Sequence, residues 1–292
     1  AWGIGNEVEL RTKPEQREQI FKVLNRLAKI AKELDPKHPT VVVVAGMDAG
    51  KAAHLNEHCP DVDIIGINVY STLATLPAKL TEWKFERPYF VTEWGPVGHW
   101  ESPHTAWNAP VEPTSTQKAA QFRRAYEQGI LGDARRCLGS YAFVWAHKQE
   151  ATATWFGLFL KSGERVNIQD TLTRMWTGKE PEFPSPDISP VEITGDTFAP
   201  GTQVAVKVKV TSPRPVRMEW LLARESDDRK DGGDAERAPD AWSNGITDKG
   251  NGEAMITLPQ TAGAYRIFVY ARDDKGGAAT ANVPVRVAEK AQ

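Results

Sequence analysis

Two glutamates follow short apolar runs in this sequence. Glu7 comes directly after the run AWGIGN at the start of the chain, and Glu93 lies within Val91–Gly95, which reads VTEWG. If both runs are strands of one barrel, the two carboxylates face each other across a cleft. Such a pair can divide the roles of nucleophile and general acid/base in breaking a glycosidic bond. Glu7 and Glu93 are therefore the candidate catalytic residues.

Alternating strands and helices are predicted around these glutamates. Apolar and β-branched runs predict buried strands at Trp2–Asn6, Val41–Val44, Asp63–Tyr70, Tyr89–Thr92 and Leu138–Ala146. Helical spacing of apolar residues predicts helices at Pro14–Leu34 and Gln117–Leu131. A short helix is expected at Gly50–His58 and a final one at Ile168–Trp176, and Leu73–Trp83 is expected to be either helical or irregular. This alternation is typical of an α/β fold in which helices lie outside a parallel sheet. Residues 1–180 are thus expected to form one α/β domain.

The pattern changes after residue 180. Residues 181–190, PEFPSPDISP, contain four prolines and predict a linker. Beyond it, short alternating runs predict strands at Gln203–Val210, Val216–Arg224, Ala254–Leu258, Tyr265–Ala271 and Ala281–Val287. Such a series over residues 191–292 is typical of an immunoglobulin-like β-sandwich. The charged stretch Glu225–Arg237 is expected to be a solvated loop within it.

Composition excludes several classes of partner. The chain has 292 residues, of which 40% are apolar and 25% charged, and its net charge is −2. This balance gives no reason to expect a nucleic acid or an anionic membrane as partner, and no apolar run approaches the ~18 residues of a membrane helix. The cysteines, Cys59 and Cys137, form no metal motif and are expected to be free. No cofactor or metal is expected. Oligomeric state is left open, and a secreted or periplasmic location is favoured.

The first 180 residues resemble the second half of the (β/α)8 barrel of retaining glycoside hydrolases. The segments WGIGNE (2–7), PYFVTEWG (88–95) and YAFVW (141–145) are similar to the ends of the fourth, seventh and eighth barrel strands. The resemblance is greatest to the family 2 enzymes, which include β-galactosidases, β-mannosidases and β-glucuronidases, and family 5 glucanases come second. It implies a partial TIM barrel, about strands four to eight, followed by the sandwich.

The resemblance assigns roles to particular residues. Glu93 would be the nucleophile and Glu7 the acid/base of a retaining double displacement on a carbohydrate substrate. Asn6 would bind the 2-hydroxyl of the sugar. Tyr70, at the end of the predicted strand Asp63–Tyr70, would donate a hydrogen bond to Glu93.

Aromatic residues are expected to bind the sugar rings. Trp145 would lie beneath the apolar face of a sugar. Trp94 and Trp100 belong to the long loop after Glu93, and loops of this length in compact domains are usually functional. We expect these residues to line further sugar subsites.

The resemblance also leaves three β/α units without a counterpart. A complete barrel takes ~250 residues, so three units correspond to roughly 90–100 residues. Five strands cannot close a barrel, and the outer two would be open edges. We therefore expect the chain to be a fragment of a longer protein, with little activity by itself.

Other functions fit the same sequence features. A transglycosylase would use the same two glutamates. A non-catalytic glycan-binding or cell-surface protein would retain the aromatic residues without turnover. The sandwich could itself bind carbohydrate through Trp220 and Trp242, but Trp220 lies in an apolar strand, which favours a packing role.

Overall fold

The chain forms two compact units in this computed structural model, which describes residues 1–230 and 232–288. The first unit comprises Ala1–Gly95 and Arg124–Phe143. The second comprises Pro96–Arg123 and the chain from Val144 onward. The predicted division of the chain at residues 181–190 stays a prediction.

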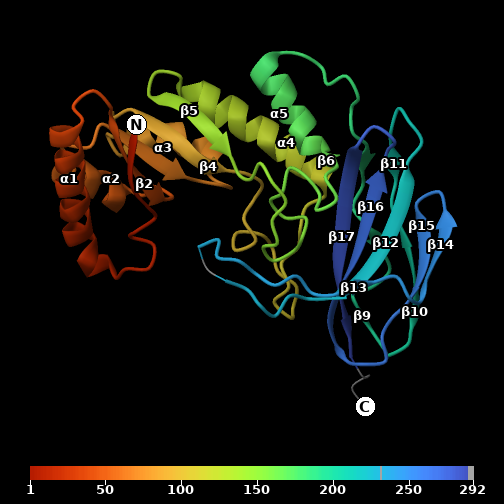
Figure 1. The fold of residues 1–292 in the computed structure, drawn as a ribbon. Helices are drawn as coiled ribbons and strands as arrows, with labels where there is room; N and C mark the ends of the chain where they lie inside the picture. Colours follow the sequence, from red (N-terminus) through yellow and green to blue (C-terminus); the bar gives the residue numbers. More distant parts are fainter. Residues whose placement is uncertain (231, 289–292) are drawn as a thin grey trace. The chain divides into compact units, whose positions relative to one another are not determined.

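A parallel sheet of five strands forms the centre of the first unit (Figure 1). Its strands are β1 (Trp2–Asn6), β2 (Thr40–Ala45), β3 (Ile64–Asn68), β4 (Tyr89–Trp94) and β5 (Cys137–Ala142). They lie in the order β1-β2-β3-β4-β5, and every neighbouring pair is parallel. The predicted parallel sheet of an α/β fold is therefore confirmed.

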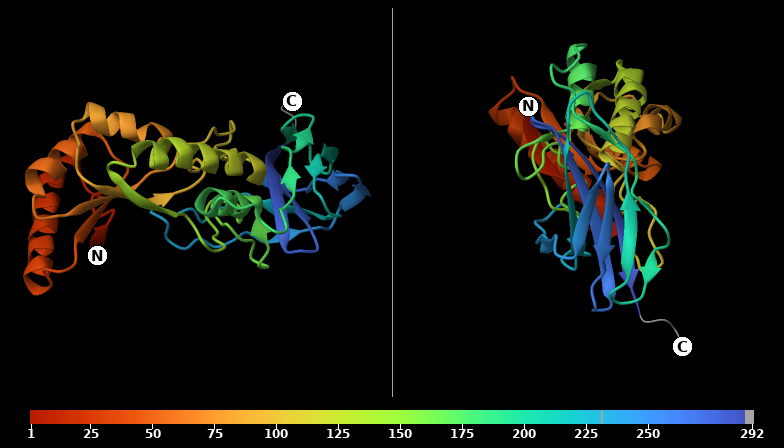
Figure 2. Two further views of the ribbon diagram at one scale, coloured as in Figure 1. Left: turned by 90° about the horizontal axis from the view of Figure 1, so that it is seen from above. Right: turned by 90° about the vertical axis from the view of Figure 1, so that its right-hand side faces the viewer.

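Helices connect these strands. They are α1 (Arg17–Leu34), which follows a 3-10 turn at Pro14–Gln16, α2 (Ala49–His58), and α3 (Leu76–Glu82), which follows a 3-10 turn at Leu73–Thr75. Between β4 and β5 come α4 (Ser115–Ala125), a π-helical turn (Tyr126–Ile130) and a 3-10 turn (Leu131–Asp133). Helix α1 packs against β1 and β2, as Figure 2 shows, and buries Phe21, Leu24 and Ala28.

Gly66 in β3 allows the side chains of the adjacent strands to approach each other. A Cβ atom at this position would lie 2.7 Å from Cγ2 of Val43 and 2.9 Å from Cγ2 of Thr92. Because side chains two residues apart on a strand share a face, Gly66 leaves room beside Asn68 at the end of β3. The glycine thus permits Thr92 to lean over β3 toward Asn68.

Antiparallel sheets dominate the second unit. Its helix is α5 (Asn167–Thr177), and its strands are β6 (Arg165–Val166), β7 (Asp187–Ile188), β8 (Glu192–Ile193), β9 (Thr197–Phe198), β10 (Gln203–Lys207), β11 (Val210–Thr211), β12 (Arg217–Arg224), β13 (Ala241–Trp242), β14 (Ile246–Gly250), β15 (Glu253–Thr257), β16 (Gly263–Arg272) and β17 (Gly277–Val287). One sheet has the order β13-β12-β16-β17-β6, and β9 also pairs with β17. A second has the order β14-β15-β10-β8, and β11 pairs with β7.

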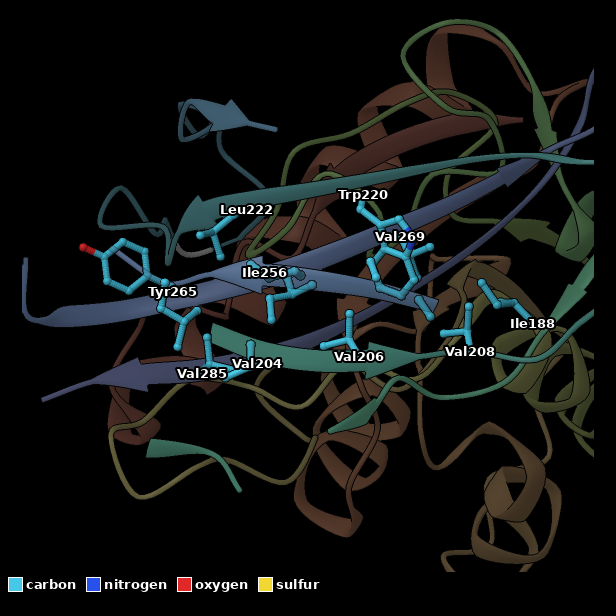
Figure 3. Packing of buried hydrophobic residues seen from close by; sticks show 14 of the residues in the cluster. Ile188, Val204, Val206, Val208, Trp220, Leu222, Ile256, Tyr265, Val269 and Val285 are labelled. Atoms are coloured by element: carbon cyan, nitrogen blue, oxygen red, sulfur yellow. The ribbon is translucent and has the colours of Figure 1, made fainter. Parts of the chain in front are cut away.

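Alternation of side chains builds the core between the two larger sheets. In β10, for example, Val204 and Val206 point inward while their neighbours are exposed. Figure 3 shows them packed against residues of β12, β15, β16 and β17, including Trp220. Trp220 is only 3% exposed, so the prediction that it is a core residue is confirmed.

The other face of the β16–β17 pair carries a buried polar network. The Glu112 carboxylate is completely buried against the Lys118 ammonium and accepts hydrogen bonds from Thr152 (2.6 Å) and from Asn282 of β17 (2.6 Å). Arg266 of β16 donates to Asn282 (2.6 Å) and is 1% exposed. Buried charges are stable only when they are paired and hydrogen-bonded in this way. The network therefore fixes the segment around Glu112 on the sheet.

Both cysteines are free, as predicted, and both are buried. Burial raises the pKa of the Cys59 thiol to about 11, which keeps it protonated at neutral pH. Within residues 1–230 and 232–288, no group of three or more His, Cys, Asp or Glu side chains is arranged to hold a metal ion. None of the helices in that part of the chain is long and apolar enough to cross a membrane.

Candidate active site

The two candidate catalytic glutamates lie at the carboxyl ends of their strands. Glu7 comes directly after β1, and Glu93 is the second-last residue of β4. The carboxyl ends of parallel strands meet at one edge of a sheet, which is where α/β enzymes place their active sites. Both side chains are half-buried, which leaves them partly accessible to solvent.

Asn68, at the end of β3, links Glu7 to the neighbouring strands. Its Nδ2 donates to Oε1 of Glu7 (2.9 Å) and to Oδ1 of Asn6 (3.2 Å). Its Oδ1 accepts from the hydroxyl of Thr92 on β4 (2.7 Å). In the β3–β4 register, Asn68 is paired with Glu93. A single amide that is 3% exposed therefore connects β1 to β4 at the strand ends.

These hydrogen bonds span the neighbouring strand. Because β2 lies between β1 and β3, Asn68 reaches Asn6 and Glu7 across two strand spacings, which is ~10 Å in a flat sheet. Curvature of the sheet would shorten this span and bring Glu7 closer to the carboxyl end of β4.

Tyr70 binds the second glutamate. Its hydroxyl donates to Oε2 of Glu93 (3.0 Å), and its ring packs edge-on against Phe143 with ring centres 6.1 Å apart. A Cβ at Gly95 would lie 3.4 Å from Cε1 of Tyr70, an ordinary contact, but only 3.1 Å from the carbonyl oxygen of Phe143. The glycine therefore allows the backbone of Phe143 to approach the end of β4. The hydrogen bond expected between Tyr70 and Glu93 is thus present in the structure.

Glu7 has an unusual backbone conformation. Its φ is +51°, in the left-handed region that residues other than glycine rarely adopt. Its amide donates to the carbonyl oxygen of Val43 on β2 (3.0 Å), which holds the residue in this conformation. Strained backbone of this kind is concentrated at functional sites, where it costs on the order of 1–3 kcal/mol.

The side chain of Glu9 is buried in an ion pair. Its Oε1 lies 3.0 Å from Nζ of Lys51 and accepts from the amide of Ala45 (2.8 Å). Both charged side chains are at most 8% exposed. This pair ties the segment after Glu7 to the end of β2 and the start of α2. It therefore holds the backbone that follows Glu7 in place.

The three tryptophans predicted to bind sugar have different surroundings. Trp94 is completely buried and stacks on Tyr126 within the first unit. Trp100 and Trp145 belong to the second unit and are 54% and 57% exposed. Trp145 stacks on Trp176 with ring centres 6.4 Å apart. The exposed faces of Trp100 and Trp145 are therefore accessible to a ligand, whereas Trp94 is enclosed by protein.

Sequence reasoning did not single out Asn68. It stands within the run DIIGINVY, which is otherwise apolar apart from its ends. A polar residue at the end of a fully buried strand needs hydrogen-bond partners. That requirement is the signal in the sequence that could have identified it.

No protein-family model and no curated protein matches this sequence. Among solved structures, the chain is similar to the GH51 alpha-L-arabinofuranosidase of Thermotoga petrophila RKU-1 (11% identity, TM-score 0.41, 97% of this chain) and to the alpha-L-arabinofuranosidase of Thermotoga maritima (11%, 0.43, 98%). It spans 66% of the length of each. An exo-beta-agarase matches 55% of this chain and 22% of its own, at 16% identity and a TM-score of 0.37. With TM-scores below 0.5, the function has to be argued from the geometry of the site itself.

Proposed function

We propose that the site hydrolyses O-glycosidic bonds of an oligo- or polysaccharide with retention of configuration. The observation that carries the proposal is the connection of two strand-end glutamates through β3. Asn68 binds Glu7 and is paired in register with Glu93, and Tyr70 binds Glu93. Two half-buried carboxylates at one sheet edge, each bound by a neutral donor, suit a pair with different roles.

In the first step, the Glu93 carboxylate attacks the anomeric carbon while the Glu7 carboxyl protonates the departing oxygen. The C–O bond to the leaving group breaks, and a glycosyl ester forms on Glu93. In the second step, Glu7 removes a proton from water, whose oxygen displaces the ester and regenerates both side chains. Asn6 is proposed to bind the 2-hydroxyl, and Trp100 and Trp145 to stack on sugar rings.

The proposal requires a strongly curved sheet. In a flat sheet, the three spacings from β1 to β4 would separate the strands by ~14 Å, whereas a retaining pair needs carboxylates ~5–5.5 Å apart. The hydrogen bonds of Asn68 across β2 support such curvature. We accordingly propose that residues 1–180 form part of a (β/α)8 barrel, about its strands four to eight, and that residues 191–292 form an immunoglobulin-like sandwich.

An exposed apolar stripe on α1 is consistent with a larger barrel. Val23, Leu27, Ile30 and Leu34 recur at helical spacing and are 42–82% exposed, although α1 already buries another face against the sheet. Helices of a closed barrel pack against helices on both sides. The stripe thus supports a further β/α unit beside α1.

Two other functions share part of the site. A transglycosylase would use Glu7 and Glu93 with a sugar in place of water as acceptor. A non-catalytic glycan-binding or cell-surface protein would need the exposed faces of Trp100 and Trp145 but neither carboxylate.

Substitution of the two glutamates tests the proposal. The protein that carries this chain is assayed against a panel of aryl glycosides and oligosaccharides, with Glu7→Gln and Glu93→Gln as variants. We expect both to lose at least ~10³-fold in kcat/KM, as loss of covalent or acid/base chemistry predicts, while sugar binding survives. Glu9→Gln, which alters the supporting pair, should retain more activity. Undiminished turnover in Glu93→Gln would exclude the assignment, and products elongated at high acceptor concentration would identify a transglycosylase.

A further inference from the structure

A tight turn in the second unit holds a strained residue. Ala151 has a φ of +58°, which an alanine rarely adopts, and it is 3% exposed. On either side of it, Glu150 and Thr152 exchange backbone hydrogen bonds of 3.1 and 2.7 Å. A conformation of this kind persists only where surrounding contacts enforce it.

The enforcing contact comes from a distant part of the chain. Oε2 of Glu236 accepts a hydrogen bond from the amide of Ala151 over 2.8 Å, and its Oε1 accepts from the amide of Lys230 (3.1 Å). Beside it, Nζ of Lys148 donates to the carbonyl oxygen of Gly233 (2.7 Å). The stretch Glu225–Arg237 was expected to be a solvated loop. Gly233 and Glu236 are only partly exposed, because they bind Lys148 and Ala151, each 85 residues earlier in the chain.

The turn at Glu150–Thr152 positions a cluster of charged and aromatic side chains. The Glu150 carboxylate is buried, with Oε1 at 3.5 Å from Nε2 of His99 and Oε2 at 3.5 Å from Nζ of Lys148. The His99 ring lies edge-on against Trp100, with ring centres 4.9 Å apart. Contacts therefore run from Glu236 through the turn to the exposed indole of Trp100.

We propose that Glu236 is a positioning residue for substrate binding. It holds the turn that places Glu150 beside His99, and through His99 it fixes the orientation of Trp100 as a stacking surface for a sugar ring. This inference rests on the proposed function, because it takes the ligand of Trp100 to be a glycan. Glu236 touches Ala151 and Lys230 rather than the proposed catalytic pair, so its loss should weaken glycan binding and leave the chemical step unchanged.

The position of Glu236 in the chain extends this role to residues 191–292, which are expected to form the β-sandwich. Glu236 lies between β12 and β13, strands of the six-stranded sheet. A connection between two strands of this sheet thus holds the turn that follows Trp145 in the sequence. On this proposal, residues 191–292 contribute to substrate binding.

The test compares Glu236→Ala with Glu236→Gln and with Glu253→Ala. Gln retains an oxygen that accepts the Ala151 hydrogen bond. Glu253 is a half-exposed glutamate on β15, paired with Lys207 and not with the turn, so its removal is the matched control. Hydrogen exchange at the Ala151 amide is the first readout, and we expect it to be on the order of tenfold faster in Glu236→Ala, as loss of one charge-assisted hydrogen bond predicts. The Gln and control variants should stay within about twofold of the wild type.

Glycan binding is the second readout. Calorimetric titration with cellohexaose, xylohexaose and arabinohexaose should give a severalfold higher Kd for Glu236→Ala, close to that of Trp100→Ala, with kcat within twofold wherever turnover is measurable. If hydrogen exchange at the Ala151 amide is the same in Glu236→Ala as in the wild type, the proposed contact is wrong. If exchange is faster but the Kd and KM of Glu236→Ala equal those of the wild type, the positioning role is wrong. If the wild type binds none of the three glycans, the proposal for Trp100 and Glu236 falls. The proposed function is judged separately, by Glu93-dependent hydrolysis.

Discussion

The hydroxyl of Tyr70 donates a hydrogen bond to Oε2 of Glu93 over 3.0 Å. The two residues come from the ends of successive β/α units, and Val69 also binds Glu93 through its amide, to the carbonyl oxygen (2.8 Å). A nucleophilic carboxylate must present one oxygen to the anomeric carbon. The tyrosine fixes which rotamer it adopts.

Tyr70→Phe should lower kcat/KM by about 10–100-fold, since a hydrogen bond to a charged group is worth ~1.5–3 kcal/mol. The measurement is steady-state kinetics on an aryl glycoside that the protein cleaves. Tyr141→Phe is the control, because Tyr141 is 63% exposed and its ring lies against that of Phe90, with ring centres 6.1 Å apart. Equal rates for Tyr70→Phe and wild type would show that the hydroxyl has no part in catalysis.

Asn68→Ala removes the amide that joins β1, β3 and β4. We expect a loss of ~1–3 kcal/mol in the free energy of unfolding, because the half-buried Thr92 hydroxyl loses its acceptor, together with a large loss of activity. Asn25→Ala provides the comparison, since Asn25 also bridges two segments of the first unit, through Asp61. It should cost similar stability and leave turnover intact. Equal activities in the two variants would contradict a catalytic role for the Asn68 contacts.

Lys51→Met leaves Glu9 buried without its cation. Breaking a buried pair from one side typically costs ~3–5 kcal/mol, so urea unfolding of this variant should occur at much lower denaturant concentration. Lys32→Met removes a comparable partner from Asp63, but that pair is 34–40% exposed and should cost less than ~1 kcal/mol. Similar effects of the two substitutions would contradict the supporting role of the Glu9–Lys51 pair.

The buried network around Glu112 should make stability depend on acid pH. Burial alone would raise the pKa of the Glu112 carboxyl, but the charges of Lys118 and Arg266 and the hydrogen bonds of Lys118 and Thr152 outweigh it and hold the pKa below its usual value. Because the folded-state pKa is the lower one, this stabilisation is complete above the pKa of the unfolded chain, ~4.3, and is lost as the pH falls through the folded-state pKa.

Urea unfolding at pH 7 and at pH 3 measures this dependence. The wild type should lose more of its free energy of unfolding between the two pH values than the double variant Glu112→Gln/Lys118→Met. Lys118→Met alone should be the least stable at pH 7, by ~3–5 kcal/mol relative to wild type, because it isolates a buried carboxylate. An identical pH dependence in wild type and double variant would contradict the assignment.

The regular elements could be predicted because their patterns are local. The valine run of β2 and the alternation in β10 specify strands without reference to the rest of the chain, and the observed bounds differ from the predicted ones by few residues. The hydrogen-bond partners of Asn68 and Glu236 could not be predicted. Both depend on contacts between residues 61 and 85 positions apart, which no periodicity in the sequence encodes.

The residues of the candidate site also differ in how far the sequence alone identifies them. Glu7 and Glu93 stand out because a carboxylate directly after an apolar strand is visible in the sequence. Burial of individual aromatic residues is not visible there. Trp94 and Trp100 are close in the sequence, but Trp94 is the last residue of β4 and is enclosed, whereas Trp100 follows the strand and is half-exposed.

Covalent trapping tests the central claim most directly. The protein that carries this chain is incubated with a panel of 2-deoxy-2-fluoro glycosyl fluorides, which form long-lived glycosyl esters with retaining nucleophiles, and the labelled peptide is located by mass spectrometry. Our account predicts a single label on Glu93, absent from Glu93→Gln, and products that keep the anomeric configuration of the substrate. A label on another residue, or products of inverted configuration, would contradict it.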